Sequence, residues 1–183
     1  MIEDRIKHAQ SIGGEAYSES GRRNPIRRDT NEVLASLVLA KRPRLIVEVG
    51  TGYGTSTLCM ALSLPEGGRI VTFELSNPVA EEVQAMFDAE NVPAHVVAGK
   101  IEDVFDPAVL DGQQIDLLFL DGEKSAYAAH LALLEPHLAP GALILADNTI
   151  DRQTEAQPYL DYVGKHYQTF TIPTECGLTV SSR

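Results

Sequence analysis

The segment from Leu45 to Ser56, with the sequence LIVEVGTGYGTS, constrains the fold of this chain more than any other. Its first five residues are mostly branched and apolar and include no glycine or proline, so they predict a fully buried strand. Glycines alternate at 50, 52 and 54 and predict a tight turn, and Thr55 or Ser56 is expected to cap the helix that follows. A strand, a glycine turn and a helix N-terminus together predict a site for a nucleotide-like molecule.

The spacing of the glycines distinguishes between kinds of nucleotide site. A dinucleotide fingerprint, G-x-G-x-x-G, would need a glycine at position 55, which is Thr. The chain has E-x-G-x-G-x-G, with Glu48 two residues before Gly50, and this resembles the first motif of class I methyltransferases that bind S-adenosylmethionine. That cofactor carries an ammonium and a sulfonium, so an acidic residue at the strand end is electrostatically favourable. A glycine turn from another kind of α/β protein stays open as an alternative for this segment alone.

Apolar strands alternate with amphipathic helices along the rest of the chain. This alternation predicts an α/β fold with a mostly parallel seven-stranded sheet and helices on both faces, and the resemblance makes it a Rossmann-like class I methyltransferase fold. We expect a single domain over residues 1–183, in which residues 1–29 form an N-terminal extension. The expected strands are 45–49, 69–73, 94–98, 115–120, 142–146, 168–172 and 178–182, and the expected helices are 30–41, 78–90, 123–138 and 154–166, with short helical segments within 1–28, after 55 and near 102.

Charge and composition narrow the class of partner. The net charge of −11 and the isoelectric point near 4.8 argue against tight non-specific binding of nucleic acid, and the basic cluster at residues 22, 23, 27 and 28 reads as a solvated approach to a helix. The apolar runs are too short to cross a membrane, and the charged N-terminus does not resemble a secretion signal. Two cysteines form no disulfide framework, so we expect a cytoplasmic protein.

Acidic and amide side chains follow four of the expected strands, where a parallel sheet gathers its ligands. Glu74 lies 24 positions after Gly50, and its carboxylate is expected to accept hydrogen bonds from both ribose hydroxyls of the cofactor. The turn from Gly99 to Glu102 is expected beside the adenine. Asp and Asn are also common turn residues, so the argument depends on the joint occurrence of these side chains.

Asp121, Asp147 and Asn148 form a second group at neighbouring strand ends. Two carboxylates and one amide oxygen are hard ligands that suit an octahedral ion such as Mg²⁺ and leave positions open for a substrate. The histidines and cysteines do not have zinc spacing, and His130 is interpreted with the other histidines as an ordinary surface or partly packed residue. Lys124, three residues after Asp121, is expected in the first turn of a helix, from which its ammonium reaches back over the strand ends.

These residues carry a resemblance to a narrower family. The run Asp121-Gly-Glu-Lys-Ser-Ala-Tyr127 and the later Asp147-Asn148 resemble the D-x-x-K-x-x-Y and D-N motifs of the cation-dependent O-methyltransferases, the group that includes catechol and caffeoyl-CoA O-methyltransferases. The similarity extends from about Thr30 to the closing segment CGLTVS at residues 176–181. The chain departs from the family in having less sequence before the glycine motif and no tryptophan-containing loop after Asn148, and both regions shape the family's acceptor pocket.

The resemblance implies an enzyme with a defined set of ligands. S-adenosylmethionine donates the methyl group, Mg²⁺ or another divalent cation such as Mn²⁺ is held by Asp121, Asp147 and Asn148, and Lys124 acts as the catalytic base. The acceptor is a vicinal-dihydroxy small molecule, neither nucleic acid nor membrane is an expected partner, and a homodimer is possible. The expected cofactor contacts are Glu48, Gly50, Thr51, Gly52, Tyr53, Ser56, Glu74, Gly99, Ile101, Glu102 and Asp121.

Three alternatives remain open at this point. Related enzymes methylate a hydroxylated uridine in transfer RNA, and the arginine cluster supports that reading although the acidity of the chain weighs against it. The same site with a different pocket would act on a sugar or an antibiotic precursor. A non-catalytic protein that only binds the cofactor would not need the metal ligands and the lysine.

Overall fold

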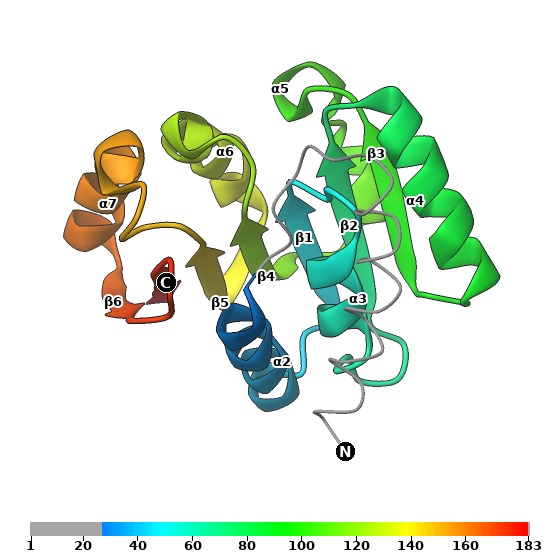
Figure 1. Cartoon of the computed structure of the whole chain (residues 1–183), viewed down its shortest axis with the longest axis horizontal. Coiled ribbons are helices and arrows are strands. Elements are labelled where there is room, and N and C mark those ends of the chain that lie inside the picture. The colour runs from blue at the N-terminus through cyan, green and yellow to red at the C-terminus, as the bar shows by residue number, and fades with distance from the viewer. Residues whose placement is uncertain (1–26, 183) are drawn as a thin grey trace.

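The computed structural model describes residues 27–182, which form a seven-stranded sheet with helices on both sides (Figure 1). The strand order is β3-β2-β1-β4-β5-β7-β6, and β7 alone runs antiparallel to its neighbours. The strands are β1 Leu45–Val49, β2 Arg69–Glu74, β3 Ala94–Ala98, β4 Ile115–Leu120, β5 Leu138–Ala146, β6 Gln168–Ile172 and β7 Leu178–Ser182. This arrangement confirms the predicted Rossmann-like, mostly parallel sheet.

The α-helices connect the strands and divide between the two faces. They are α2 Arg28–Lys41, α3 Thr55–Ala61, α4 Asn77–Ala89, α5 Ile101–Val104, α6 Tyr127–Leu134 and α7 Gln153–His166, and short 3₁₀ helices cover η1 Pro107–Leu110, η2 Lys124–Ala126 and η3 Glu135–His137. Side chains of β1 alternate between the faces because a strand has a period of two residues. Val47 therefore packs with α6 and α7, whereas Ile46 packs with α2.

Three sequence predictions about these elements need correction or fall outside the described residues. The continuous helix expected over 123–138 is wrong, because Pro136 ends it in 3₁₀ geometry and β5 already begins at Leu138. The pairing of β4 with β5 shifts register between Ile115 and Leu117, which accommodates the extra residues of β5 as a bulge. The helix α2 begins at Arg28, two residues earlier than expected, and the helix expected within residues 1–28 falls almost wholly outside the described part.

The carboxyl ends of the central strands lie level at one edge of the sheet. The backbone pairing continues for one residue past each strand, because the amide N–H groups of Gly50, Asp121 and Asp147 donate to carbonyls of the neighbouring strands at 2.9–3.0 Å. Val49 pairs with Leu120, which in turn pairs with Ala146. The residues that follow these strands are thereby brought side by side. Among residues 27–182, no helix has the length and apolar character needed to span a bilayer.

Candidate active site

A cavity of about 750 Å³ opens at this edge of the sheet. All the residues expected to contact the cofactor line it, except Glu48, and Lys124 and Asn148 line it as well. It extends past the metal-ligand candidates to the start of α7, where Asp151, Arg152 and Glu155 form its wall. The cavity therefore joins the predicted cofactor site to a second region large enough for an acceptor.

Two glycines of the turn after β1 serve different purposes. Gly50 has φ +103°, and a Cβ built there would lie 2.7 Å from the backbone of Asp121 and Gly122, so this position lets the β1 and β4 loops pack together. Gly52 has φ +54° with no heavy atom within 4 Å of a built Cβ, and it lines the cavity. Gly52 is thus the glycine that keeps the backbone accessible to a ligand, while Gly50 is required by packing.

Glu74 ties the end of β2 to the glycine turn. Its Oε2 accepts a hydrogen bond from the backbone N–H of Gly52 at 2.9 Å, and its Oε1 accepts one from the N–H of Ser76 at 3.0 Å. The side chain is buried but lines the cavity. The predicted contact of Glu74 with the ribose hydroxyls stays a prediction.

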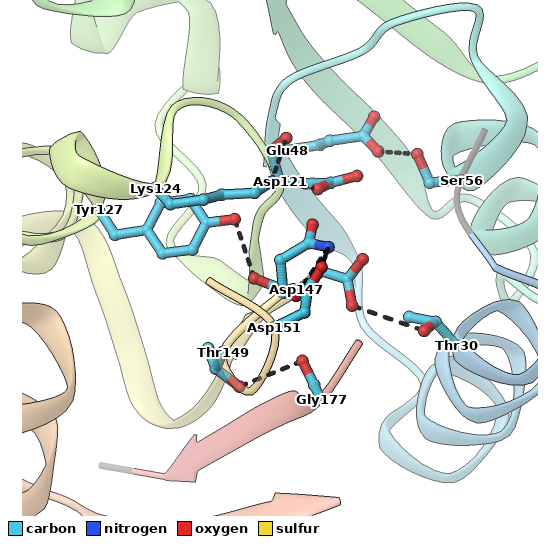
Figure 2. A network of polar contacts seen from close by, with 11 residues as sticks. Thr30, Glu48, Ser56, Asp121, Lys124, Tyr127, Asp147, Thr149, Asp151 and Gly177 are labelled. Atoms are coloured by element: carbon cyan, nitrogen blue, oxygen red, sulfur yellow. Dashed lines mark hydrogen bonds and ion pairs between the residues drawn. The ribbon is translucent and has the colours of Figure 1, made fainter. Parts of the chain in front are cut away.

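Glu48 points away from the cavity, into the face covered by α3. The carboxylate is fully buried and accepts hydrogen bonds from three hydroxyls, those of Ser56 at 2.5 Å, Thr57 at 2.5 Å and Thr72 at 2.7 Å. Burial raises the pKa of Glu48 to about 7 in spite of these hydrogen bonds. The carboxylate does not line the cavity, and its hydrogen bonds join β1 to β2 and to α3. Figure 2 shows the hydrogen bond with Ser56 of α3. A cofactor contact by Glu48 stays a prediction.

The hydroxyls around Glu48 correct the expected helix cap. The N-cap position of α3 is Gly54 and has no side-chain cap, because the hydroxyl of Ser56 is directed at Glu48. Ser56 still lines the cavity. The sequence shows only a Thr-Ser pair at a helix start, which is why capping was the natural expectation.

The predicted adenine end of the cavity includes a histidine that the sequence interpretation passed over. His130 of α6 is buried and lines the cavity, and its Nε2 lies 3.6 Å from Oε1 of Glu102. Burial lowers the pKa of His130, which favours the neutral imidazole. The signal was available in the sequence, because His130 lies on the buried face of α6 with Tyr127, Leu131 and Leu134.

Asp121 follows β4, and Asp147 and Asn148 follow the adjacent end of β5; Asn148 contacts Asp151, which the sequence interpretation did not include. Figure 2 shows Asp121, Asp147 and Asp151 in the same region. Asn148 has φ +61°, a left-handed conformation that Asn adopts more readily than most residues. Its Nδ2 donates to the carboxylate of Asp151 at 3.2 and 3.3 Å, so Oδ1 is left as the amide's acceptor atom. Asp147 is buried, and its Oδ1 lies 3.5 Å from the hydroxyl of Thr30 on α2. Thr30 is not among the site residues expected from the sequence.

The charges of this group fit a divalent cation. Burial and the nearby Asp121 raise the pKa of Asp147 to about 7, and burial also raises the pKa of Asp121 although Lys124 opposes that change. Within residues 27–182 no three His, Cys, Asp or Glu side chains are arranged to hold a metal ion, so the set depends on the amide oxygen of Asn148. Two repelling carboxylates with an adjacent amide form the hard oxygen donor set that Mg²⁺ or Mn²⁺ prefers.

Lys124 lies between the metal-ligand candidates and the first residue of α6. Its Nζ donates to Oδ1 of Asp121 at 2.7 Å and to the backbone carbonyl of Asp121 at 3.2 Å. The side chain is only 15% exposed, and Nζ lies 5.4 Å from the ring centroid of Tyr127. Nζ of Lys124 is thus held beside the carboxylate of Asp121 at the wall of the cavity, and the role of Lys124 as a base stays a prediction.

Comparisons with known proteins agree with this geometry. A family model described as a methyltransferase domain matches residues 47–149. A catechol O-methyltransferase of Niastella koreensis is 34% identical over 65% of this chain and 54% of its own length, and a human transmembrane O-methyltransferase is 35% identical over 65% and 43%. The chain therefore spans about half the length of these curated relatives.

A solved structure extends the likeness to nearly the whole chain. The O-methyltransferase of Bacillus cereus, determined in complex with SAH, superposes with a TM-score of 0.80 at 20% identity and covers 98% of this chain and 90% of its own. At that identity the match supports the fold. Together with the family model, which spans more than half of the sequence, it places the protein in the methyltransferase domain family.

Proposed function

We propose that the protein is an S-adenosylmethionine-dependent, divalent-metal-dependent O-methyltransferase that acts on a vicinal-dihydroxy small molecule. One observation carries the proposal: Asp121, Asn148 and Lys124 line the same cavity as the glycine turn, with Asp147 buried directly beside them. The similarity to relatives named catechol O-methyltransferase supports the same reaction.

The cofactor occupies the end of the cavity formed by the turn after β1 and the ends of β2 and β3. There the backbone at Gly52 leaves space for close approach, and Glu74 is held in place to accept hydrogen bonds from the ribose. Ile101 and Glu102 line the adenine region. This assignment places the sulfonium towards the ends of β4 and β5, where the acceptor must reach it.

Asp121, Asp147 and Asn148 would hold the cation, which when bound would lower the pKa of an acceptor hydroxyl at that position. Lys124 Nζ, as the neutral amine, would accept the proton of that hydroxyl and become an ammonium. The acceptor oxygen then attacks the methyl carbon in line with the sulfur, so an O–CH₃ bond forms while the S–CH₃ bond breaks and its electrons stay on the sulfur. Two neighbouring hydroxyls on the acceptor fix the geometry better than one.

The test is methyl transfer to a catechol by the purified chain with S-adenosylmethionine, followed by mass spectrometry, with Mg²⁺ and with chelator. We expect a monomethyl ether with Mg²⁺ and loss of activity on chelation, restored by excess Mg²⁺. Asp147→Asn should remove metal dependence and most of the turnover while S-adenosylhomocysteine still binds. Turnover that chelator leaves unchanged would overturn the metal requirement.

The alternative acceptors enter the same assay as further arms. Transfer only to RNA would replace the proposed substrate class, although the described arginines of the basic cluster are paired: Arg27 with Glu175 at 3.5 Å and Arg28 with Glu32 at 2.9 Å. Transfer to a sugar or an antibiotic precursor would keep the chemistry and change the acceptor. Cofactor binding without transfer to any acceptor would support a non-catalytic protein. The homodimer, the cytoplasmic location and the single domain over residues 1–183 stay predictions.

A further inference from the structure

Tyr127, the last residue of the Asp121–Tyr127 motif, contacts both halves of the proposed catalytic group. It is fully buried at the start of α6. Its hydroxyl donates to the backbone carbonyl of Asp147 at 3.1 Å, and its ring lies 5.4 Å from Nζ of Lys124 (Figure 2). The hydrogen bond also satisfies a donor that would destabilise the fold if it were buried without a partner.

The carbonyl that accepts this hydrogen bond belongs to the peptide between Asp147 and Asn148. The orientation of that peptide sets the directions of both neighbouring side chains, which are the two candidate metal ligands from β5. The following turn is fixed from its other side by β7 and the loop before it, where Thr149 Oγ1 donates to Gly177 O at 3.1 Å and Ile150 N donates to Cys176 O at 2.9 Å. Tyr127 supplies the hydrogen bond from the α6 side.

The ring of Tyr127 also restricts Lys124. A lysine side chain has four rotatable side-chain bonds. A single hydrogen bond from Nζ to Asp121 at 2.7 Å therefore allows several rotamers of the methylene groups. An aromatic face beneath the ammonium attracts the charge and removes that freedom. The ring itself is held edge-on by Tyr159 of α7, with ring centroids 5.7 Å apart.

We propose that Tyr127 is a positioning residue that fixes the Asp147–Asn148 peptide and the Lys124 ammonium relative to each other. The inference rests on the proposed function, because it assigns a task to a residue beside that site. Its hydroxyl orients the proposed metal ligands Asp147 and Asn148, and its ring restricts Lys124. Substitutions can therefore remove the hydroxyl alone or the whole ring.

The experiment compares Tyr127→Phe, Tyr127→Leu and the matched control Tyr159→Phe in the full chain. Tyr159 is an equally buried tyrosine in contact with the same ring, and its hydroxyl lies near Ser181 and forms no hydrogen bond with the described residues of the proposed site. Mn²⁺ affinity is measured by electron paramagnetic resonance, S-adenosylhomocysteine affinity by calorimetry, and kcat and KM by methyl transfer to a catechol.

We expect Tyr127→Phe to weaken Mn²⁺ binding about tenfold or more, the usual range for a residue that orients a metal ligand, with unchanged S-adenosylhomocysteine affinity. Tyr127→Leu should in addition lower kcat at saturating Mn²⁺ well below that of Tyr127→Phe, because the ring is lost. Tyr159→Phe should match the wild type in all three measurements.

Two results would overturn the inference. One is a folded Tyr127→Phe protein with wild-type Mn²⁺ affinity and wild-type kcat. This result would be decisive even if Tyr127→Leu did not fold. The other is an equal loss in Tyr127→Phe and Tyr159→Phe, which would indicate general packing. If the wild-type chain transfers methyl groups but binds no Mn²⁺, the metal part of the proposed function and this inference are both rejected. If the wild-type chain binds Mn²⁺ and transfers methyl groups, and the Tyr127 variants do the same to the same extent, only the inference is rejected.

Discussion

The two ends of the cavity satisfy their carboxylates in different ways. At the proposed cofactor end, Glu74 accepts hydrogen bonds from two backbone N–H groups, and Glu48, buried outside the cavity, accepts hydrogen bonds from three hydroxyls. At the proposed acceptor end, burial raises the pKa of Asp121 and of Asp147, and the charge of Asp121 raises the pKa of Asp147 further. Among the described residues, Lys124 is the cation that forms an ion pair with this group. Glu48 and Glu74 are therefore held by hydrogen bonds within the protein, whereas Asp121 and Asp147 lie together with one ion-paired lysine, as the proposed cation site requires.

The largest expected effect is a loss of kcat without a loss of cofactor affinity, when Lys124 at the proposed acceptor end is replaced. Lys124→Ala should lower kcat for methyl transfer by about 10²–10⁴-fold, the range of a lost general base, and leave S-adenosylhomocysteine affinity unchanged in calorimetry. Lys165→Ala, at an exposed position of α7, is the control. Equal kcat in the two variants would remove the lysine from the chemistry, and a parallel loss of cofactor affinity would show that the ends are not independent.

A second prediction concerns Glu48 and the pH dependence of the free energy of unfolding. Burial raises the pKa of Glu48 from 4.5 to about 7, so the folded chain holds this proton at a pH where the unfolded chain has released it. Its contribution to stability is therefore complete below about pH 4.5 and is lost as the pH rises to about 7. Glu48→Gln should remove that share, roughly 3 kcal/mol, from the pH dependence of the free energy of unfolding.

Urea denaturation between pH 4.5 and 8 provides this measurement. A residual slope should remain in Glu48→Gln, because burial also raises the pKa of Asp147 to about 7. Glu66→Gln, at an exposed turn position, applies the same chemical change without burial and should keep the wild-type profile. A Glu48→Gln profile identical to that of Glu66→Gln would contradict the interpretation of Glu48.

The smallest expected effect distinguishes two glycines of one turn. Gly50→Ala should destabilise the chain by about 2 kcal/mol more than Gly52→Ala, because its Cβ would overlap the backbone of Asp121 and Gly122. Gly52→Ala has open space and costs about 1 kcal/mol for its left-handed backbone, but its methyl group enters the cavity. Thermal unfolding and S-adenosylhomocysteine calorimetry measure the two effects. The reverse order of stabilities would show that the turn packs differently.

Much of the site was predictable because it lies at the ends of strongly marked strands. Glu74, Asp121 and Asn148 directly follow or end apolar runs, and parallel pairing brings the ends of neighbouring strands to one edge. The helix over 123–138 was not predictable in detail, since its apolar stripe continues past Pro136 although the hydrogen bonding does not. Thr30 joins the site from α2, 117 positions before Asp147 in the sequence, where no local pattern marks the contact.

The sequence by itself determined the order of strands and helices, the glycine turn and the acidic groups at the strand ends, because these depend on side-chain period and local backbone freedom. Only the tertiary structure decided where each carboxylate finds its partners. Glu48 faces α3 because strand side chains alternate, and it is buried among three hydroxyls from two elements, α3 and β2. Asp147 meets Asp121, Tyr127 and Thr30 because the sheet register and the packing of α6 and α2 place them there. Such contacts join residues up to 117 positions apart, and they depend on the whole fold.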